Sequence, residues 1–162
     1  MAFRISSKNE RMNCLLDSNI FLEGILLQTH AEEVRTFLSD TDNFALSMSD
    51  FSLHSIGHIL FRRRSYVAFQ KFVDDVVGRL GVTVLHLDPG DLSSVITAAQ
   101  QYTLDFDDAY QYIVAEKYGL TIVSYDRDFD RTPRARTTPG ILLQELNQQD
   151  DDNQDNGNEA TL

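Results

Sequence analysis

Cysteine is almost absent from this 162-residue chain, and the single one, Cys14, lies inside an apolar run. One cysteine excludes a disulfide framework, so a reducing cytoplasm is the simplest location for the protein. The sequence also lacks any run of about 18 apolar residues, the length that a membrane-spanning helix needs. Residues 1–11 carry charge but no apolar core of a signal peptide, and we expect a short disordered extension there.

Basic residues are in the minority as well, with 14 Lys and Arg against 25 Asp and Glu, a net charge of −11. Residues 147–162 hold five of these acids and no base, and their Gln-, Asn- and Asp-rich composition predicts a disordered acidic tail. Residues 1–146 therefore carry 20 acids and 14 bases, a net charge of −6. This balance argues against a protein that holds nucleic acid by charge alone. It is compatible with an enzyme whose acids are neutralised by a bound metal ion.

Strand-like and helix-like segments alternate along residues 12–146. The apolar runs predict strands at 12–16, 44–47, 82–87, 120–125 and near 141–142. Amphipathic spacing and capping residues predict helices at 18–28, 31–38, 49–63, 66–80, 89–102 and 108–119. Such alternation favours a parallel sheet covered on both faces. We expect one α/β domain, a three-layer α/β/α sandwich around a central parallel sheet.

Three aspartates stand at the ends of these predicted elements. Asp17 and Asp126 each follow an apolar run that reads as a strand, and Asp108 opens a helix that precedes the second run. Open α/β sheets bind ligands outside the carboxyl ends of their strands, so these carboxylates can meet in one crevice. Crowded carboxylates raise one another's pKa unless a cation lies among them, and hard oxygen ligands select Mg²⁺ or Mn²⁺. The pattern predicts a metal-dependent site.

Each of these acids also has a plainer structural use. The side chain of Asp17 can cap a helix by accepting hydrogen bonds from the backbone N–H groups of its first turn. Asp107 and Asp108 can be N-terminal helix acids stabilised by the helix dipole. We expect one of that pair to cap the helix and Asp108 to point inward, because it begins the periodic stripe of the helix. Asp126 and Asp128 can form an Asx-turn, and for Asp128 the structural and functional interpretations stay open.

Three motifs, in order over about residues 12–146, resemble those of PIN-domain nucleases. They are Leu15-Leu16-Asp17-Ser18-Asn19-Ile20-Phe21, Phe106-Asp107-Asp108-Ala109 with Ala115 and Gly119, and Ile122-Val123-Ser124-Tyr125-Asp126-Arg127-Asp128-Phe129. The resemblance implies a PIN-like fold and a ribonuclease that uses Mg²⁺ or Mn²⁺. It assigns metal-binding and catalytic roles to Asp17, Asp108 and Asp126, an accessory metal-binding role to Asp128, and a ligand- or water-positioning role to Asn19.

The sequence departs from the family pattern in the helix after the second strand, where PIN domains usually have a glutamate. Residues 49–58 contain none. By spacing, Ser55 or His54 takes that place, and Asp50 lies one turn earlier. Either a metal ligand is missing, or His54 or Asp50 substitutes for it. His54 and His58 share a helix face, but no third zinc ligand is evident nearby.

Arginines follow the last of the three motifs. We expect Arg127, Arg131, Arg134 and Arg136 to contact the RNA backbone, because they lie just past Asp126. A second basic group, Arg62-Arg63-Arg64, reads either as a solvated helix end favoured by the helix dipole or as a further phosphate contact.

Two functions from different classes remain open at this point. The resemblance is closest to small bacterial or archaeal PIN proteins, many of them VapC-like toxins. It implies an endoribonuclease with RNA as substrate, an antitoxin as candidate partner and a homodimer as one candidate assembly. The missing glutamate motivates the alternative, a non-catalytic PIN-like domain that binds RNA or a protein. A haloacid dehalogenase-type phosphatase fits poorly because it needs an aspartate where Asn19 stands.

Overall fold

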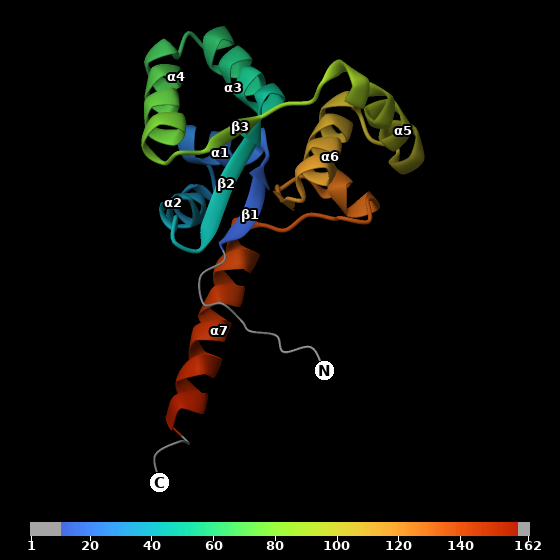
Figure 1. Cartoon of the computed structure of the whole chain (residues 1–162). Coiled ribbons are helices and arrows are strands. Elements are labelled where there is room, and N and C mark those ends of the chain that lie inside the picture. Colours follow the sequence, from blue (N-terminus) through green and yellow to red (C-terminus); the bar gives the residue numbers. More distant parts are fainter. Residues whose placement is uncertain (1–10, 159–162) are drawn as a thin grey trace.

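Four parallel strands form the central sheet in the computed structural model, which describes the backbone of residues 11–158 and the side chains of residues 11–148. The strands are β1 (Met12–Leu16), β2 (Phe44–Ser49), β3 (Thr83–Leu85) and β4 (Thr121–Val123). Their order across the sheet is β3-β2-β1-β4, and every pairing is parallel (Figure 1). The chain therefore places β2 and then β3 on one side of β1, and it then crosses the sheet to place β4 on the other side of β1. The carboxyl ends of β1 and β4 therefore mark the switch point, where α/β sheets bind ligands.

Seven α-helices surround this sheet in the described part of the chain. They are α1 (Ser18–Ile25), α2 (Ala31–Ser39), α3 (Asp50–Arg62), α4 (Tyr66–Phe72), α5 (Leu92–Tyr102), α6 (Phe106–Tyr118) and α7 (Pro139–Asn158). A π-helical turn, Val73–Arg79, continues α4, and short 3₁₀ turns occur at Pro89–Asp91 and Arg127–Arg131. No helix in residues 11–158 has the length and apolar character that crossing a membrane requires.

Two apolar cores lie on opposite faces of the sheet, because side chains of a strand alternate in direction. Cys14 and Leu16 of β1 join the core formed with α1, α2, α3 and α4, while Leu15 joins the core formed with α5 and α6. Ile122 and Val123 of β4 divide between the two cores in the same way. The expected three-layer α/β/α sandwich is confirmed.

The boundaries of α6 matter because this helix carries Asp108. Its N-terminal cap is Asp105, whose Oδ1 accepts a hydrogen bond of 2.9 Å from the backbone N–H of Asp108. The expectation that Asp107 or Asp108 caps the helix is wrong, since capping by Asp105 leaves both acids inside the first turn. Gly119 ends α6 with a φ of 66°, a left-handed conformation that costs glycine little.

The predicted strand near 141–142 is also wrong. Pro139 fixes the first turn of α7, and Thr138 Oγ1 accepts a hydrogen bond from the backbone N–H of Ile141. Only Thr137 reaches the sheet, through one isolated bridge to Val123. Leu142 is buried and Ile141 is exposed, so the two apolar residues lie on different sides of a helix.

Two predictions concern the ends of the chain, the N-terminal extension and the acidic C-terminal tail. The predicted extension lies outside the described residues except for Arg11. Helix α7 runs through Asn158, into the stretch from Asn147 that composition predicts to be disordered. Whether the fold needs that stretch stays a prediction, and truncation tests it.

Candidate metal-binding site

Asp17 and Asp126 leave neighbouring strands at the same edge of the sheet. Leu16 pairs with Val123 in the register of β1 and β4, and the backbone N–H of Asp17 donates to the carbonyl of Val123 over 3.0 Å. The chain turns after each strand into a helical segment that the aspartate caps. Strand pairing therefore brings these two acids to the switch point, as predicted.

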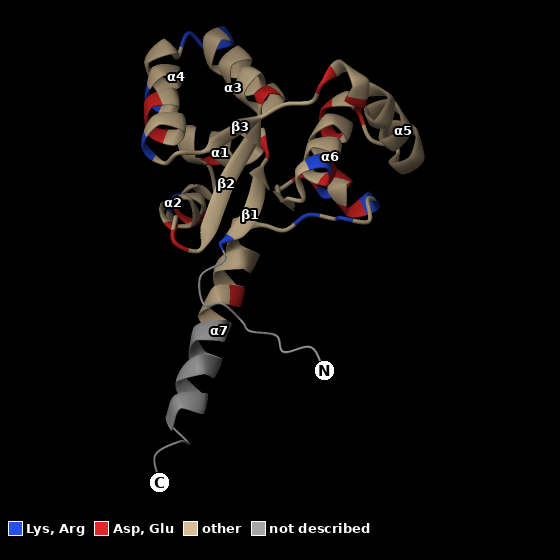
Figure 2. Cartoon of the chain, viewed as in Figure 1, with Lys and Arg blue, Asp and Glu red and all other residues tan. Residues whose placement is uncertain are grey.

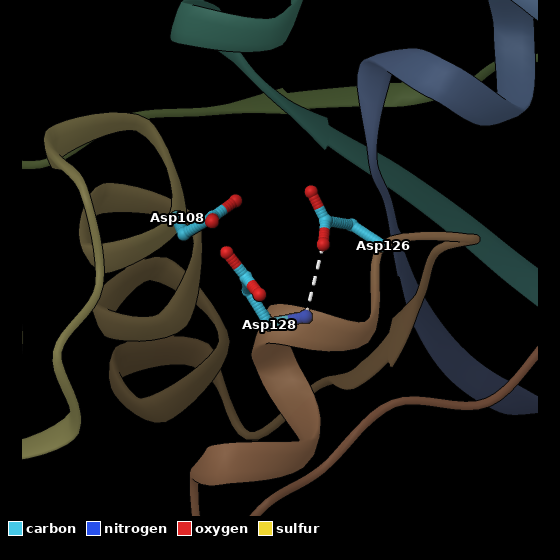
Figure 3. Close-up of side chains that lie close together, drawn as sticks. All are labelled: Asp108, Asp126 and Asp128. Atoms are coloured by element: carbon cyan, nitrogen blue, oxygen red, sulfur yellow. Dashed lines mark hydrogen bonds between the residues drawn. The ribbon is translucent and has the colours of Figure 1, made fainter.

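Asp108 reaches the same place from α6, and Asp128 from the 3₁₀ turn after β4. Asp108 is the only carboxylate that is buried among the described residues, with 9% of its surface exposed. One carboxylate oxygen from each of Asp108, Asp126 and Asp128 lies within 4.8 Å of the others, and the three side chains converge in Figure 3. The backbone N–H of Asp128 also donates to Asp126 Oδ1 over 2.9 Å, so the Asx-turn and the acidic cluster are both present.

Asp17 lies beside this cluster, outside the group of three whose oxygens meet. Its Oδ1 accepts from the backbone N–H of Ser18 (2.6 Å), and its Oδ2 accepts from Asn19 Nδ2 (2.8 Å) and Ser124 Oγ (2.7 Å). Ser124 Oγ in turn accepts from the backbone N–H of Asp126 over 2.9 Å. A single hydroxyl therefore fixes the position of one site acid relative to the other.

Asn19 also forms hydrogen bonds with the segments around Asp17 and Ser124. Its Nδ2 also approaches Ser124 Oγ at 3.0 Å, and its Oδ1 accepts from the backbone N–H of Tyr125 over 3.3 Å. The asparagine thus links the start of α1 to the loop after β4. In this structure it orients protein groups around Asp17.

Of the four acids at this edge, only Asp128 has a basic partner among the described residues, namely Arg131. Burial raises the pKa of Asp108 to about 7, and the charges of Asp105, Asp126, Asp17 and Asp128 add to the shift. Burial also raises the pKa of Asp17, although hydrogen bonds from Ser124, Ser18 and Gln111 oppose it. A divalent cation between the carboxylates removes this repulsion, and three carboxylates are the hard oxygen donors that Mg²⁺ or Mn²⁺ prefers.

Ser52 of α3 contacts Gln111, a buried residue of α6, the helix that carries Asp108. Ser52 is 1% exposed, and its Oγ accepts a hydrogen bond from Gln111 Nε2. Ser55 is half-buried and His54 is exposed, and the assignment of the expected acidic position to one of them stays a prediction. Ser52, Ile56 and Leu60 recur every four residues and are all buried, so they form the core-facing side of α3.

Gln111 was not predicted as a site residue. Its side chain is 3% exposed, lies close enough to hydrogen-bond Asp17, and carries an Oε1 that has no hydrogen-bond partner among the described residues. A neutral amide and a serine thus pack together beside Asp17, and neither adds a negative charge to the site.

Asp50 is held away from the acidic cluster. Its Oδ1 accepts from its own helix at Phe51 N–H (2.8 Å) and from Tyr110 Oη (2.9 Å). Tyr110 Oη also accepts from the backbone N–H of Leu87 over 3.0 Å. Asp50 therefore joins α3, α6 and the end of β3 as a structural contact.

Most of the predicted RNA-binding arginines are paired within the chain. Arg131 pairs with Asp128 (2.8 Å), Arg134 with Glu116 (2.6 Å), and Arg136 with Asp130 (3.4 Å). Arg134 and Arg136 also donate to the backbone carbonyls of Leu120 and Ser124. Of the four, only Arg127 forms no ion pair among the described residues.

Comparison with known proteins agrees with this geometry. The family model of the PIN domain matches residues 14–135, which include all four site acids. No curated protein sequence matches the chain.

Solved structures share the fold at low sequence identity. PAE2754 from Pyrobaculum aerophilum superposes with a TM-score of 0.61 at 21% identity, covering 85% of this chain and 98% of its own. VapBC2 from Rickettsia felis, solved with a promoter DNA fragment, gives 0.63 at 17% identity and covers 77% and 96%. VapC20 from Mycobacterium tuberculosis, described as a sarcin-ricin loop cleaving toxin, gives 0.61 at 15% identity and covers 72% and 92%.

Proposed function

Because this chain belongs to the PIN-domain family, we propose that it is a metal-dependent endoribonuclease that hydrolyses phosphodiester bonds of RNA. The observation that carries the proposal is the convergence of Asp108, Asp126 and Asp128, with the pKa of Asp108 raised to about 7 by burial and by like charges. An acidic cluster of this kind gains stability when it holds a cation. PIN domains are usually nucleases that use divalent metals.

Each site residue has a separate part in this proposal. Asp108, Asp126 and Asp128 would hold Mg²⁺ or Mn²⁺ through one oxygen each, and Asp17 would flank the ion from the β1 side. Such an ion, when bound, lowers the pKa of a water molecule and stabilises the leaving oxygen. Asn19 and Ser124 keep Asp17 and Asp126 in register, and no covalent protein nucleophile is needed.

We further propose that the protein acts in the cytoplasm as the toxin of a toxin–antitoxin pair. Several structural neighbours are toxin–antitoxin complexes, among them one from Klebsiella pneumoniae and FitAcB from Neisseria gonorrhoeae. Co-purification of this chain with the product of a neighbouring short reading frame tests for an antitoxin. Size-exclusion chromatography of the chain alone tests for a homodimer.

RNA cleavage is tested with purified protein, a structured RNA and Mn²⁺, beside the variants Asp17→Asn and Asp126→Asn. Asp42→Asn is the matched control, because Asp42 is exposed in the turn before β2, at the opposite edge of the sheet. We expect cleavage by the wild type and the control, loss in both site variants, and loss on adding EDTA. Cleavage that persists in the site variants would come from a contaminating nuclease. RNA binding without cleavage by the wild type would favour the non-catalytic alternative.

A further inference from the structure

Three consecutive arginines, Arg62 to Arg64, lie at the turn between α3 and α4, which is coloured as basic in Figure 2. All three are exposed. Two backbone hydrogen bonds close the turn, from the N–H of Arg64 to the carbonyl of Phe61 (2.9 Å) and from the N–H of Ser65 to the carbonyl of Leu60 (2.8 Å). Arg64 adopts a φ of 54°, a left-handed conformation that glycine would adopt with less strain. The turn is therefore fixed in its backbone and strongly basic on its surface.

These arginines differ from three of the four arginines beside the acidic site in having no acidic partner among the described residues. None of them forms an ion pair within the part of the chain whose side chains are described, whereas Arg131, Arg134 and Arg136 all do. Their charge is thus available to a ligand, on a body whose residues 1–146 have a net charge of −6. The helix C-terminal dipole accounts for a preference for basic residues here, but not for three in succession.

Exposed aromatic rings adjoin the arginines. Phe61 and Tyr66 are 53% and 54% exposed, and their rings meet edge to face with centroids 5.0 Å apart. Exposed rings beside guanidinium groups are the combination that binds single-stranded nucleic acid, because bases stack on the rings while arginines contact phosphates. The dipole explanation gives no reason for these rings.

We propose that this turn, the α3–α4 tip (Phe61 to Tyr66), is a docking surface for single-stranded RNA. The inference rests on the proposed function only in taking RNA as the substrate. Helix α3 begins at Asp50, which accepts a hydrogen bond from Tyr110 of α6, the helix that carries Asp108, and the tip lies about 20 Å further along the axis of α3. A strand several nucleotides long can contact the tip and the acidic site together, and a dinucleotide cannot.

The phosphate contacts are tested in the Asp126→Asn background with EDTA, so that binding of a labelled 12-nucleotide RNA is measured without cleavage. The tip variant replaces Arg62, Arg63 and Arg64 with Gln. The control replaces three other exposed basic residues, Arg35, Lys71 and Arg79, with Gln and changes the net charge of the protein by the same amount. Each lost phosphate contact removes about 0.7 from the slope of log K against log salt. We expect the tip variant to lose about 2 units of slope and the control to keep the wild-type slope.

The stacking contact is tested with Tyr66→Ala and Tyr66→Phe on the same RNA and on an abasic oligomer of equal length. We expect Tyr66→Ala to weaken RNA binding by about fivefold, the lower end for one stacked base, and to leave binding of the abasic oligomer unchanged. Tyr66→Phe should keep the wild-type affinity. Equal losses on both oligomers would overturn the stacking role.

Two further outcomes would overturn the proposal as a whole. One is equal RNA affinity in the tip variant, the control and the wild type. The other is binding of polyglutamate that the tip variant alone loses while RNA affinity is unchanged, which would assign the tip to an acidic protein. Because these assays use protein that cannot cleave, failure of the proposed nuclease activity leaves them interpretable.

Discussion

Replacing Asp108 with Asn should stabilise the metal-free protein at neutral and alkaline pH. Burial and the neighbouring acids raise the pKa of this carboxyl from 3.8 to about 7, so its ionised form destabilises the fold. The folded state then binds its proton more tightly than the unfolded state does. The corresponding stability is fully present below pH 3.8 and is lost as the pH rises through about 7.

The size of the effect follows from the shift of about three pKa units, at about 1.4 kcal/mol per unit. Wild-type protein should lose up to about 4 kcal/mol of unfolding free energy between the two limits through this group alone. Asn cannot ionise, so Asp108→Asn should gain a similar amount at pH 8 and differ little near pH 4. No side chain among the described residues donates to the Asp108 carboxylate, so the replacement breaks no hydrogen bond of that kind.

Urea unfolding in EDTA, at several values between pH 4 and pH 8, measures this difference. Asp42→Asn is the control for removing an exposed acid. Parallel stability curves for wild type and Asp108→Asn across this range would refute the reasoning. Added Mn²⁺ should stabilise wild type more at pH 8 than at pH 5, because the carboxyl must lose its proton to bind, and should do much less for Asp108→Asn.

Three other predictions concern the C-terminal tail, the core and metal binding. Truncation after Leu146 should leave the melting temperature unchanged within error in a thermal scan, because Leu146 is the last residue seen to pack against the core; a large drop would show that the tail is needed. Phe129→Ala should cost about 3–5 kcal/mol in urea unfolding, because Phe129 is fully buried under the turn that carries Asp128, and a near-neutral result would contradict that packing. Ser52→Glu should tighten Mn²⁺ binding in calorimetry while Ser55→Glu should not, since Ser52 contacts Gln111; tightening by Ser55→Glu alone would contradict this and support the position expected from spacing.

The sequence predicted the fold and the place of Asp17 and Asp126 because both depend on local signals. Short apolar runs identify parallel strands, and the residue after such a run must lie at the carboxyl edge of the sheet. Asp108 was also predicted to point inward, from the stripe of its helix. These inferences need no knowledge of how distant side chains meet.

Contacts between segments that are far apart along the chain could not be predicted from the sequence. The bond between Ser52 and Gln111 joins residues 59 positions apart, and the bond between Asp17 and Ser124 joins residues 107 apart. The pairing of Arg134 with Glu116 likewise depends on how the last loop folds back. A motif shows which residue types are available, but only the packed fold shows which of them already have partners.

The site acids differ in the number of hydrogen bonds that their carboxylates accept. Asp17 accepts from Ser18, Asn19 and Ser124, which fill much of the capacity of a carboxylate for about four hydrogen bonds. Asp108 accepts no side-chain hydrogen bond among the described residues, and its pKa, like that of Asp17, is raised by burial. A cation at this edge of the sheet would contact Asp108, Asp126 and Asp128, whose carboxylate oxygens lie within 4.8 Å of one another. Asp17, held in place by neutral donors, lies beside them.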